Sequence, residues 1–476
     1  MQNKNEILKL AEQWLADHKQ EMINDLMEFV SQRSVSRADL AEPGAPFGAE
    51  NAKMLEKALL RAAAYGFVTK NGDGYYGKAT LGDDDRSIGI IAHLDVVPEG
   101  ANWTREPFKP SLEGDFMFGR GVGDNKGSAI MALYVMRMIR ELEIPMKNGL
   151  RLILGMSEET GMQDMPFHTR MERPCKVTLV PDAAFPVCYA QKGSLNARVS
   201  IPAGDGIVSF TGGEVDNMVP PTAECVFPAD AGAVKKALAE KGFAEPEYTV
   251  RAEGDNVVVC AHGVAAHAAS PEGGKSAIHM LSSALDACGL LTGESARAIH
   301  AIAFLSQGNY GEHMNIACED EDTGKTTMVV GVAHTEKGRV TMHIDCRLSV
   351  AANIPLTKDS LRAAAEDAGF TLDYIHTTEP SFMAKDDPRV RAIMDVYREM
   401  AGDSSEPYTM GGGTYSRCLE NGITFGLSFP GNKIRPENLP ESHGSAHGPD
   451  EFVHIPSLMK CALIYLLSVL ALDEIV

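Results

Sequence analysis

Three strand-like segments in the N-terminal part of the chain each end at a side chain that can bind a metal ion or transfer a proton. Residues 87–92 run into His93 and Asp95, residues 150–155 lead to Glu158 and Glu159, and residues 175–180 are followed by Asp182. In an open α/β sheet, active sites collect beyond the carboxyl ends of the strands. The pattern therefore predicts that these five side chains gather at one edge of a sheet.

His93 and Asp95 stand two residues apart, on the same side of an extended chain. A metal-binding histidine with a carboxylate behind it uses this spacing, because the carboxylate fixes the tautomer of the ring and raises its basicity. An ordinary strand end beside a turn has the same residues. The pair alone leaves both interpretations open.

The other candidates also have plainer interpretations. Asp124 lies in the glycine-rich segment 118–127, directly before a helix predicted over 128–142, so it suits a helix cap as well as a metal ligand. Glu158 and Glu159 suit a solvated corner, but adjacent carboxylates after a buried strand can also turn to opposite sides, one to a metal ion and one free as a base. Asp182 and His447 both suit turns.

The set is more informative than its members. Two histidines and several carboxylates, without a cysteine, form a mixed nitrogen and oxygen set that suits Zn²⁺ or Mn²⁺. The number of candidate ligands is enough for two ions that share a carboxylate.

The order of the motifs resembles the co-catalytic metallopeptidase family of aminoacylase and carnosinase, and more closely the peptidase V-type dipeptidases of bacteria. The motifs are His-x-Asp at 93–95, Gly-x-x-Asp-Asn-Lys-Gly at 121–127, Glu-Glu-Thr-Gly at 158–161, Pro-Asp at 181–182 and the late His447. The resemblance extends from about residue 21 to residue 472 and includes the long insert.

The resemblance implies a role for each of these residues. His93 and Asp182 would bind one ion, Glu159 and His447 the other, and Asp124 would bridge the two. Asp95 would orient His93. Glu158 would be the general base, which takes a proton from a metal-bridged water and passes it to the leaving amine.

The insert resembles the family's lid. In segment 265–271, His267 would stabilise the oxyanion of the tetrahedral intermediate, although a loop histidine before a helix is the plainer interpretation. Asn217 and Arg347 match substrate-binding positions, and Arg347 would hold the C-terminal carboxylate of a dipeptide. The glycine loop at 410–417 would offer backbone N–H groups to the same carboxylate, with contributions from Gly412, Gly413 and Thr414.

Two positions depart from the family pattern. The late histidine is often followed by Gln-Ala-Asn-Glu, but here residues 448–451 read Gly-Pro-Asp-Glu, and His443 stands four residues earlier as a rival ligand. Asn125 follows the bridging aspartate, where a second aspartate is common. The second departure changes the hydrogen bonding around the bridge.

The predicted fold is α/β, with a mixed-sheet catalytic domain of zinc-peptidase type and an inserted α+β lid domain. Helical and strand signals alternate over 1–192, strands follow one another without a helix after each over 193–378, and the chain returns to the first domain over 379–476. The clearest alternation is at 340–348, where the even positions are apolar and Arg347 lies on the other face.

Composition excludes several kinds of partner. The formal net charge of −21 argues against nucleic acid and against an anionic membrane surface. Nine scattered cysteines without a CxxC pair suit a reducing compartment, and the apolar run 461–472 is too short to span a bilayer. We therefore predict a cytoplasmic protein. The long insert favours a monomer over a homodimer, because in peptidase V-type enzymes the extra length lets one chain complete its own site.

The function predicted is that of a dipeptidase using two divalent ions, zinc in the first place and manganese as the second choice. The alternatives are an N-acyl amino acid amidohydrolase with the same metal centre and a non-catalytic metal-binding module. A nucleotide enzyme is disfavoured, because neither glycine cluster ends in Gly-Lys-Ser/Thr.

Overall fold

The computed structural model describes residues 4–431 and 434–476, and the chain forms two compact units. Unit 1 comprises Met1–Tyr189, Met383–Tyr408 and Thr414–Val476, and unit 2 comprises Ala190–Phe382 and Thr409–Gly413. The sequence pattern predicts that 409–413 belongs to the second part of the catalytic domain. The structure joins this segment to unit 2 because it packs there: the Lys192 N–H donates to the Met410 carbonyl at 3.0 Å.

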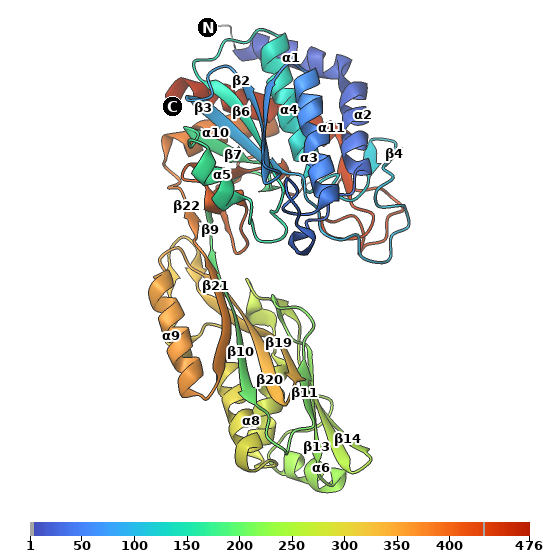
Figure 1. Ribbon diagram of the computed structural model, residues 1–476, viewed down its shortest axis with the longest axis vertical. Helices are drawn as coiled ribbons and strands as arrows, with labels where there is room; N and C mark the ends of the chain where they lie inside the picture. The colour runs from blue at the N-terminus through green and yellow to red at the C-terminus, as the bar shows by residue number, and fades with distance from the viewer. Residues whose placement is uncertain (1–3, 432–433) are drawn as a thin grey trace. The chain divides into compact units, whose positions relative to one another are not determined.

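Unit 1 is built on a mixed sheet in which four neighbouring strands run parallel (Figure 1). The strand order is β1 (Val68–Gly72), β2 (Tyr76–Leu81), β6 (Gly149–Gly155), β3 (Ser87–His93), β7 (Val177–Val180), β24 (Gly422–Phe425) and β9 (Val187–Gln191). β6, β3, β7 and β24 are parallel, while β1, β2 and β9 pair antiparallel. The carboxyl ends of β6, β3 and β7 therefore meet at one edge.

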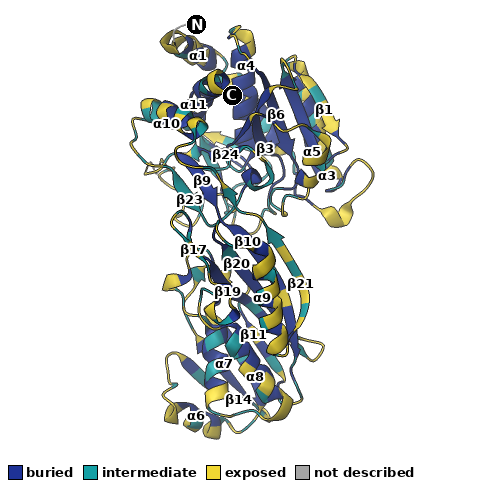
Figure 2. Cartoon of the chain, turned by 90° about the vertical axis from the view of Figure 1, so that its left-hand side faces the viewer, coloured by how far each residue is buried: buried dark blue, intermediate teal, exposed yellow. Residues whose placement is uncertain are grey.

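Seven α-helices accompany this sheet among the described residues of unit 1. They are α1 (Lys4–Asp17), α2 (Lys19–Ser31), α3 (Ala49–Ala64), α4 (Lys126–Glu141), α5 (Met165–Met171), α10 (Pro388–Ala401) and α11 (Ile455–Ile475). β3 and β6 are buried along their whole length (Figure 2), which explains their continuous apolar runs. A small sheet of β26 (Phe452–His454), β5 (Phe116–Phe118) and β4 (Ser111–Glu113) completes the unit, with β25 (Leu427–Ser428) beside β8 (Ala183–Ala184).

Unit 2 is an antiparallel α+β domain. Its sheet has the order β14 (Tyr248–Glu253), β15 (Asn256–His262), β13 (Thr222–Pro228), β11 (Ser209–Gly212), β19 (Thr327–Glu336), β20 (Arg339–Leu348), β10 (Gly193–Pro202) and β21 (Thr371–Thr378). Its helices are α6 (Ala231–Glu240), α7 (Ala277–Ala287), α8 (Gly293–Leu305) and α9 (Ile354–Asp367). The even positions of β20 join the core beneath the helices, as predicted. The predicted fold class is confirmed.

The C-terminal helix is longer than the apolar run 461–472 that predicts it. α11 has 21 residues and is apolar enough to cross a membrane by length and composition, so the argument that its apolar run is too short was wrong. The helix packs against α4 and α10, however, and thirteen of its residues are buried within unit 1. Burial in the protein accounts for its apolar character.

Candidate active site

The carboxyl ends of β3, β6 and β7 bring the predicted side chains together. His93 is the last residue of β3 and pairs in register with Gly155, the last residue of β6. Glu158 and Glu159 follow β6, and Asp182 follows β7. Asp124 stands two residues before α4, and its peptide bond to Asn125 is cis.

Nitrogen and oxygen atoms of these residues lie within a few ångströms of one another. His93 Nε2 is 3.0 Å from Asp124 Oδ1 and 3.7 Å from Asp182 Oδ1. His447 Nε2 is 3.2 Å from Asp124 Oδ2 and 3.1 Å from the Glu159 carboxylate. Asp124 thus uses one oxygen toward each histidine, the arrangement expected of a carboxylate between two ions.

The donor set fits divalent cations. Two triplets, His93-Asp124-Glu159 and His93-Glu158-Asp182, each offer ligand atoms that lie within 4.8 Å of one another. Four carboxylates so close together repel one another in a partly buried site, and cations relieve this repulsion. Glu158 belongs to the second triplet, so its carboxylate is within ligand distance and has the position of either a ligand or a base.

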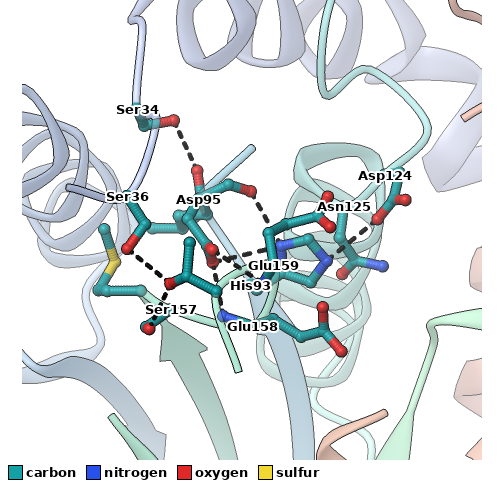
Figure 3. A network of polar contacts seen from close by, with 12 residues as sticks. Ser34, Ser36, His93, Asp95, Asp124, Asn125, Ser157, Glu158 and Glu159 are labelled. Atoms are coloured by element: carbon teal, nitrogen blue, oxygen red, sulfur yellow. Dashed lines mark hydrogen bonds and ion pairs between the residues drawn. The ribbon is translucent and has the colours of Figure 1, made fainter. Parts of the chain in front are cut away.

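Asp95 lies behind the cluster and fixes its backbone (Figure 3). Its side chain is fully buried; Oδ1 accepts a hydrogen bond from the Glu158 N–H and Oδ2 one from the Glu159 N–H, each at 3.1 Å. The ring of His93 is held by the backbone carbonyl of Asp95, 2.9 Å from Nδ1, with the carboxylate at 3.4 Å. Asp95 therefore orients His93 and also positions both glutamates.

The charges of the cluster shift several pKa values. Burial and the charge of Asp182 raise the pKa of Glu158 well above its ordinary value. Hydrogen bonds to Asp124 and Glu159 raise the pKa of His447 to about 10. Burial would lower the pKa of His93, but its hydrogen bonds to carboxylates, first of all Asp124, outweigh burial and raise it. A carboxyl group with a raised pKa such as Glu158 suits proton transfer near neutral pH.

Glu451 holds the loop that carries Asp124. Its carboxylate accepts hydrogen bonds from the N–H groups of Gly121, Gly123 and Asp124 at 2.9–3.0 Å. It also pairs with Arg120 at 2.7 Å, and both side chains are almost fully buried. Arg120 in turn donates to the carbonyl of His447 at 3.1 Å. The Glu451–Arg120 pair therefore joins the two segments that supply Asp124 and His447.

The rival histidine faces another partner. His443 Nδ1 lies 2.7 Å from Asp450 Oδ2, and Asp450 also accepts hydrogen bonds from Thr104. His447, by contrast, has left-handed backbone (φ 64°) and reaches both Asp124 and Glu159. This geometry favours His447 over His443 as the late ligand.

Two further residues shape the site: the sequence indicated altered hydrogen bonding at Asn125 without its partners, and it did not point to Asp164. Asn125 donates from Nδ2 to Asp182 Oδ1 and to the Pro181 carbonyl, both at 2.8 Å, which an ionised aspartate at this position cannot do. Asp164 accepts hydrogen bonds from the N–H groups of Met156 and Ser157 and from the hydroxyl of Tyr415. Burial raises the pKa of Asp164 to about 6.

The substrate-binding candidates of unit 2 gather in one part of that unit. β16 (Ala266–His267) pairs with β12 (Met218–Val219), and the Asn217 carbonyl accepts a hydrogen bond from Ala268 at 2.9 Å. The exposed ring of His267 accepts a hydrogen bond from the Ala269 N–H at Nδ1, 3.1 Å away, which leaves its proton on Nε2.

Arg347 and the glycine loop belong to the same region. The Nε–Nη2 edge of Arg347 pairs with Asp345 at 2.7 and 2.9 Å, and Nη1 donates to the Gly411 carbonyl at 3.3 Å. A substrate carboxylate would therefore meet the outer edge of the guanidinium and not the edge that Asp345 occupies. A Cβ at Gly411 would stand 2.5 Å from Ala269, so only glycine permits this approach.

Thr414 lies in unit 1 and is 3% exposed. Its hydroxyl contacts those of Thr424 at 2.8 Å and Ser416 at 3.2 Å. The Thr414 side chain therefore lies within a buried hydroxyl network, whereas the resemblance implies that it contacts a substrate carboxylate. Its role toward a substrate stays a prediction.

Comparison with known proteins finds a matching family model and similar bacterial proteins. The model of Peptidase family M20/M25/M40 matches residues 89–471. The Bacillus subtilis protein YtjP, whose name assigns it provisionally as a dipeptidase, is 30% identical over 458 residues, covering 94% of this chain and 96% of that protein. A Staphylococcus epidermidis protein with the same provisional assignment is 26% identical over 471 residues, covering 96% and 98%.

Solved structures share the fold at low identity. Human carnosine dipeptidase 1 matches with a TM-score of 0.57 at 14% identity, covering 98% of this chain and 99% of that one. The Saccharomyces cerevisiae dipeptidase Dug1p matches with a TM-score of 0.57 at 11% identity, covering 98% of each chain. At such identities the likeness shows the fold, and it agrees with the predicted zinc-peptidase architecture.

Proposed function

Because the chain belongs to Peptidase family M20/M25/M40, we propose that it is a metal-dependent dipeptidase that hydrolyses unblocked dipeptides. Membership confirms the family predicted from the order of the motifs and makes the protein a peptidase, as predicted. The dipeptide substrate, the two ions and the roles of the residues are the proposal.

The position of Glu158 carries this proposal. Its carboxylate lies within 4.8 Å of ligand atoms of His93 and Asp182, and burial and the charge of Asp182 raise its pKa. Adjacent Glu159 belongs to the other triplet, with Asp124. One glutamate thus faces each half of the cluster, which suits one ligand and one base.

Two divalent ions, zinc in the first place and manganese in the second, would polarise the scissile carbonyl and lower the pKa of the attacking water. His93 and Asp182 would hold one ion, Glu159 and His447 the other, with Asp124 between them. Glu158 takes a proton from the attacking water and delivers it to the nitrogen of the leaving amino acid. Asp95 keeps His93 and the two glutamates in position.

The remaining predicted residues would bind the rest of the substrate. The proton on His267 Nε2 suits donation to the oxyanion of the tetrahedral intermediate. The outer edge of Arg347 and the loop with Gly412, Gly413 and Thr414 would hold the C-terminal carboxylate of the dipeptide, and Asn217 would also contact the substrate. The guanidinium supplies the charge that this carboxylate needs.

Hydrolysis assays on metal-stripped protein test the proposal. Leu-Gly, N-acetyl-Leu-Gly and N-acetyl-leucine are compared before and after Zn²⁺ or Mn²⁺ is restored. Metal-dependent cleavage of Leu-Gly alone supports the dipeptidase. Preferred cleavage of N-acetyl-leucine moves the function to deacylation, and cleavage of none of the three by the reloaded protein contradicts both.

We also propose that the protein acts as a cytoplasmic monomer without nucleic acid or membrane partners. The nine cysteines are scattered along the chain without a CxxC pair, and the eight-stranded sheet of unit 2 lies within a single chain. Sedimentation velocity at micromolar concentration checks the oligomeric state, and a dimer would contradict this part of the proposal.

A further inference from the structure

A pocket of about 410 Å³ lies in unit 1 beside two carboxylates of the candidate metal centre. Asp124 and Asp182 line one side of it, and the N-terminal part of α11 lines another. His93, Glu158 and Glu159 do not line it, so the pocket extends away from the catalytic carboxylates, beyond Asp124 and Asp182. A pocket in contact with reactive groups on one side is the usual place for a substrate side chain.

The walls of the pocket are largely apolar. They include Leu427 and Phe429 from the segment at β25, Phe452 from β26 and Leu458 from the first turn of α11. The polar residue Ser457 contacts His454 Nδ1 at 2.9 Å. An aliphatic or aromatic side chain gains most from such a surface, because its transfer from water is favourable and needs no hydrogen-bond partner.

The charge of the pocket decides which half of a dipeptide fits. Its described lining contains two aspartates and neither lysine nor arginine. The C-terminal residue of a dipeptide carries a carboxylate, which needs a cationic partner such as a guanidinium. The first residue carries no such carboxylate, so an aliphatic or aromatic side chain on it needs no lysine or arginine in the pocket.

We propose that this pocket binds the side chain of the first residue of the dipeptide and selects substrates whose first residue is aliphatic or aromatic. The inference rests on the proposed dipeptidase function and deepens it, because it names the substrate class. The volume suffices for a leucine or phenylalanine side chain, whereas an acidic side chain would find neither lysine nor arginine among the described lining residues.

Two substitutions that change the pocket in opposite directions test the inference. Ser457→Leu fills the pocket from α11, and Phe429→Ala widens it. With metal restored, the ratio of kcat/KM for Phe-Gly to that for Ala-Gly should fall at least tenfold in Ser457→Leu. In Phe429→Ala a second ratio, kcat/KM for Trp-Gly over kcat/KM for Leu-Gly, should rise. Ser283→Leu, a half-buried serine on α7 of unit 2, is the matched control and should leave both ratios unchanged.

A binding measurement gives a second readout that does not depend on turnover. L-phenylalanine should raise the melting temperature of the wild-type protein more than L-alanine does, and Ser457→Leu should abolish the difference. If the wild type cleaves dipeptides but neither variant changes the ratios, the pocket inference is overturned and the dipeptidase stands. If the wild type cleaves no dipeptide, the proposed function fails and the inference falls with it.

Discussion

Asp95 Oδ1 accepts a hydrogen bond from the backbone N–H of Glu158 at 3.1 Å, and the same buried carboxylate lies next to the ring of His93. One side chain therefore contacts both a proposed metal ligand and the proposed base. Its other oxygen accepts the N–H of Glu159. Orientation of His93 and placement of the two glutamates are therefore one structural property, and removal of a single acceptor disturbs both.

Asp95→Asn is expected to lower kcat about 10- to 100-fold and to weaken metal binding, because the amide offers one acceptor where the carboxylate offers two. Titration with Zn²⁺ and initial rates measure the two effects. The matched control is Asp286→Asn, which alters an Asp–His pair at 2.9 Å in unit 2. Wild-type behaviour of Asp95→Asn would show that the backbone of Glu158 is positioned without it.

Glu158→Gln should reduce hydrolysis by at least about 1,000-fold and leave the metal content almost unchanged, because the amide cannot accept the proton of the attacking water. Metal analysis of the purified variant and single-substrate rates give the result. Glu141→Gln, at the far end of α4, serves as the control. Loss of one ion with the activity would instead identify Glu158 as a ligand, as its place in the triplet with His93 and Asp182 allows.

The two late histidines should behave differently. His447→Ala is expected to lower the number of bound ions, because His447 Nε2 approaches Asp124 and Glu159, whereas His443→Ala should keep the wild-type stoichiometry. Inductively coupled plasma measurements on both variants decide the matter. The opposite pattern would transfer the ligand role to His443.

His267→Ala should lower kcat by about 100-fold with little effect on metal content, since a single oxyanion donor is typically worth that much. His267→Gln, which keeps a donor, should recover part of the rate. His262→Ala, another exposed histidine of unit 2, is the control. An unchanged rate in His267→Ala would make His267 a structural loop residue.

His168 should make unit 1 less stable in mild acid. Burial lowers the pKa of His168 to about 4, against an ordinary value of 6.5. Above pH 6.5 the ring is neutral in both the folded and the unfolded chain, and its contribution is fully present. Between pH 6.5 and 4 the ring of His168 is protonated in the unfolded chain but stays neutral in the folded chain. The free energy of unfolding should therefore fall by about 3 kcal/mol as the pH is lowered through this range.

Urea unfolding followed by tryptophan fluorescence measures this effect in the right unit, because Trp14 and Trp103 both belong to unit 1. His168→Phe should unfold with a weaker dependence on pH over that window. His300→Phe, whose histidine side chain is 75% exposed, should retain the wild-type dependence. Equal pH profiles for wild type and His168→Phe would contradict the prediction.

The sequence was most informative where local pattern and chemistry coincide. Continuous apolar runs identified β3, β6 and β7, and the polar residue after each run marked the sheet edge where His93 and Asp182 lie. The alternation in β20 likewise predicted its buried face. Helices such as α9 were not predicted, although Asn353 caps it and a proline occupies its first turn, because its apolar positions are sparse.

Contacts between distant parts of the chain could not be predicted from one sequence. Glu451 accepts a hydrogen bond from the Asp124 N–H, 327 residues away in the sequence, and Asp164 accepts one from Tyr415, 251 residues away. Local periodicity in the sequence contains no information about such pairs. The pairing of Arg347 is unpredictable for a different reason. Its partner Asp345 is close in sequence, but which edge of the guanidinium pairs with it depends on the side-chain rotamers.

The place of β24 has a consequence for how the protein is made. This strand lies between β7 and β9, yet the ribosome produces it only after the whole of unit 2. Until residues 422–425 emerge, the nascent chain exposes the unpaired edges of β7 and β9, which can attract other extended segments. Unit 2 can mature first, and unit 1 closes last, so translation that stops before β24 yields a protein with an open sheet and without His447.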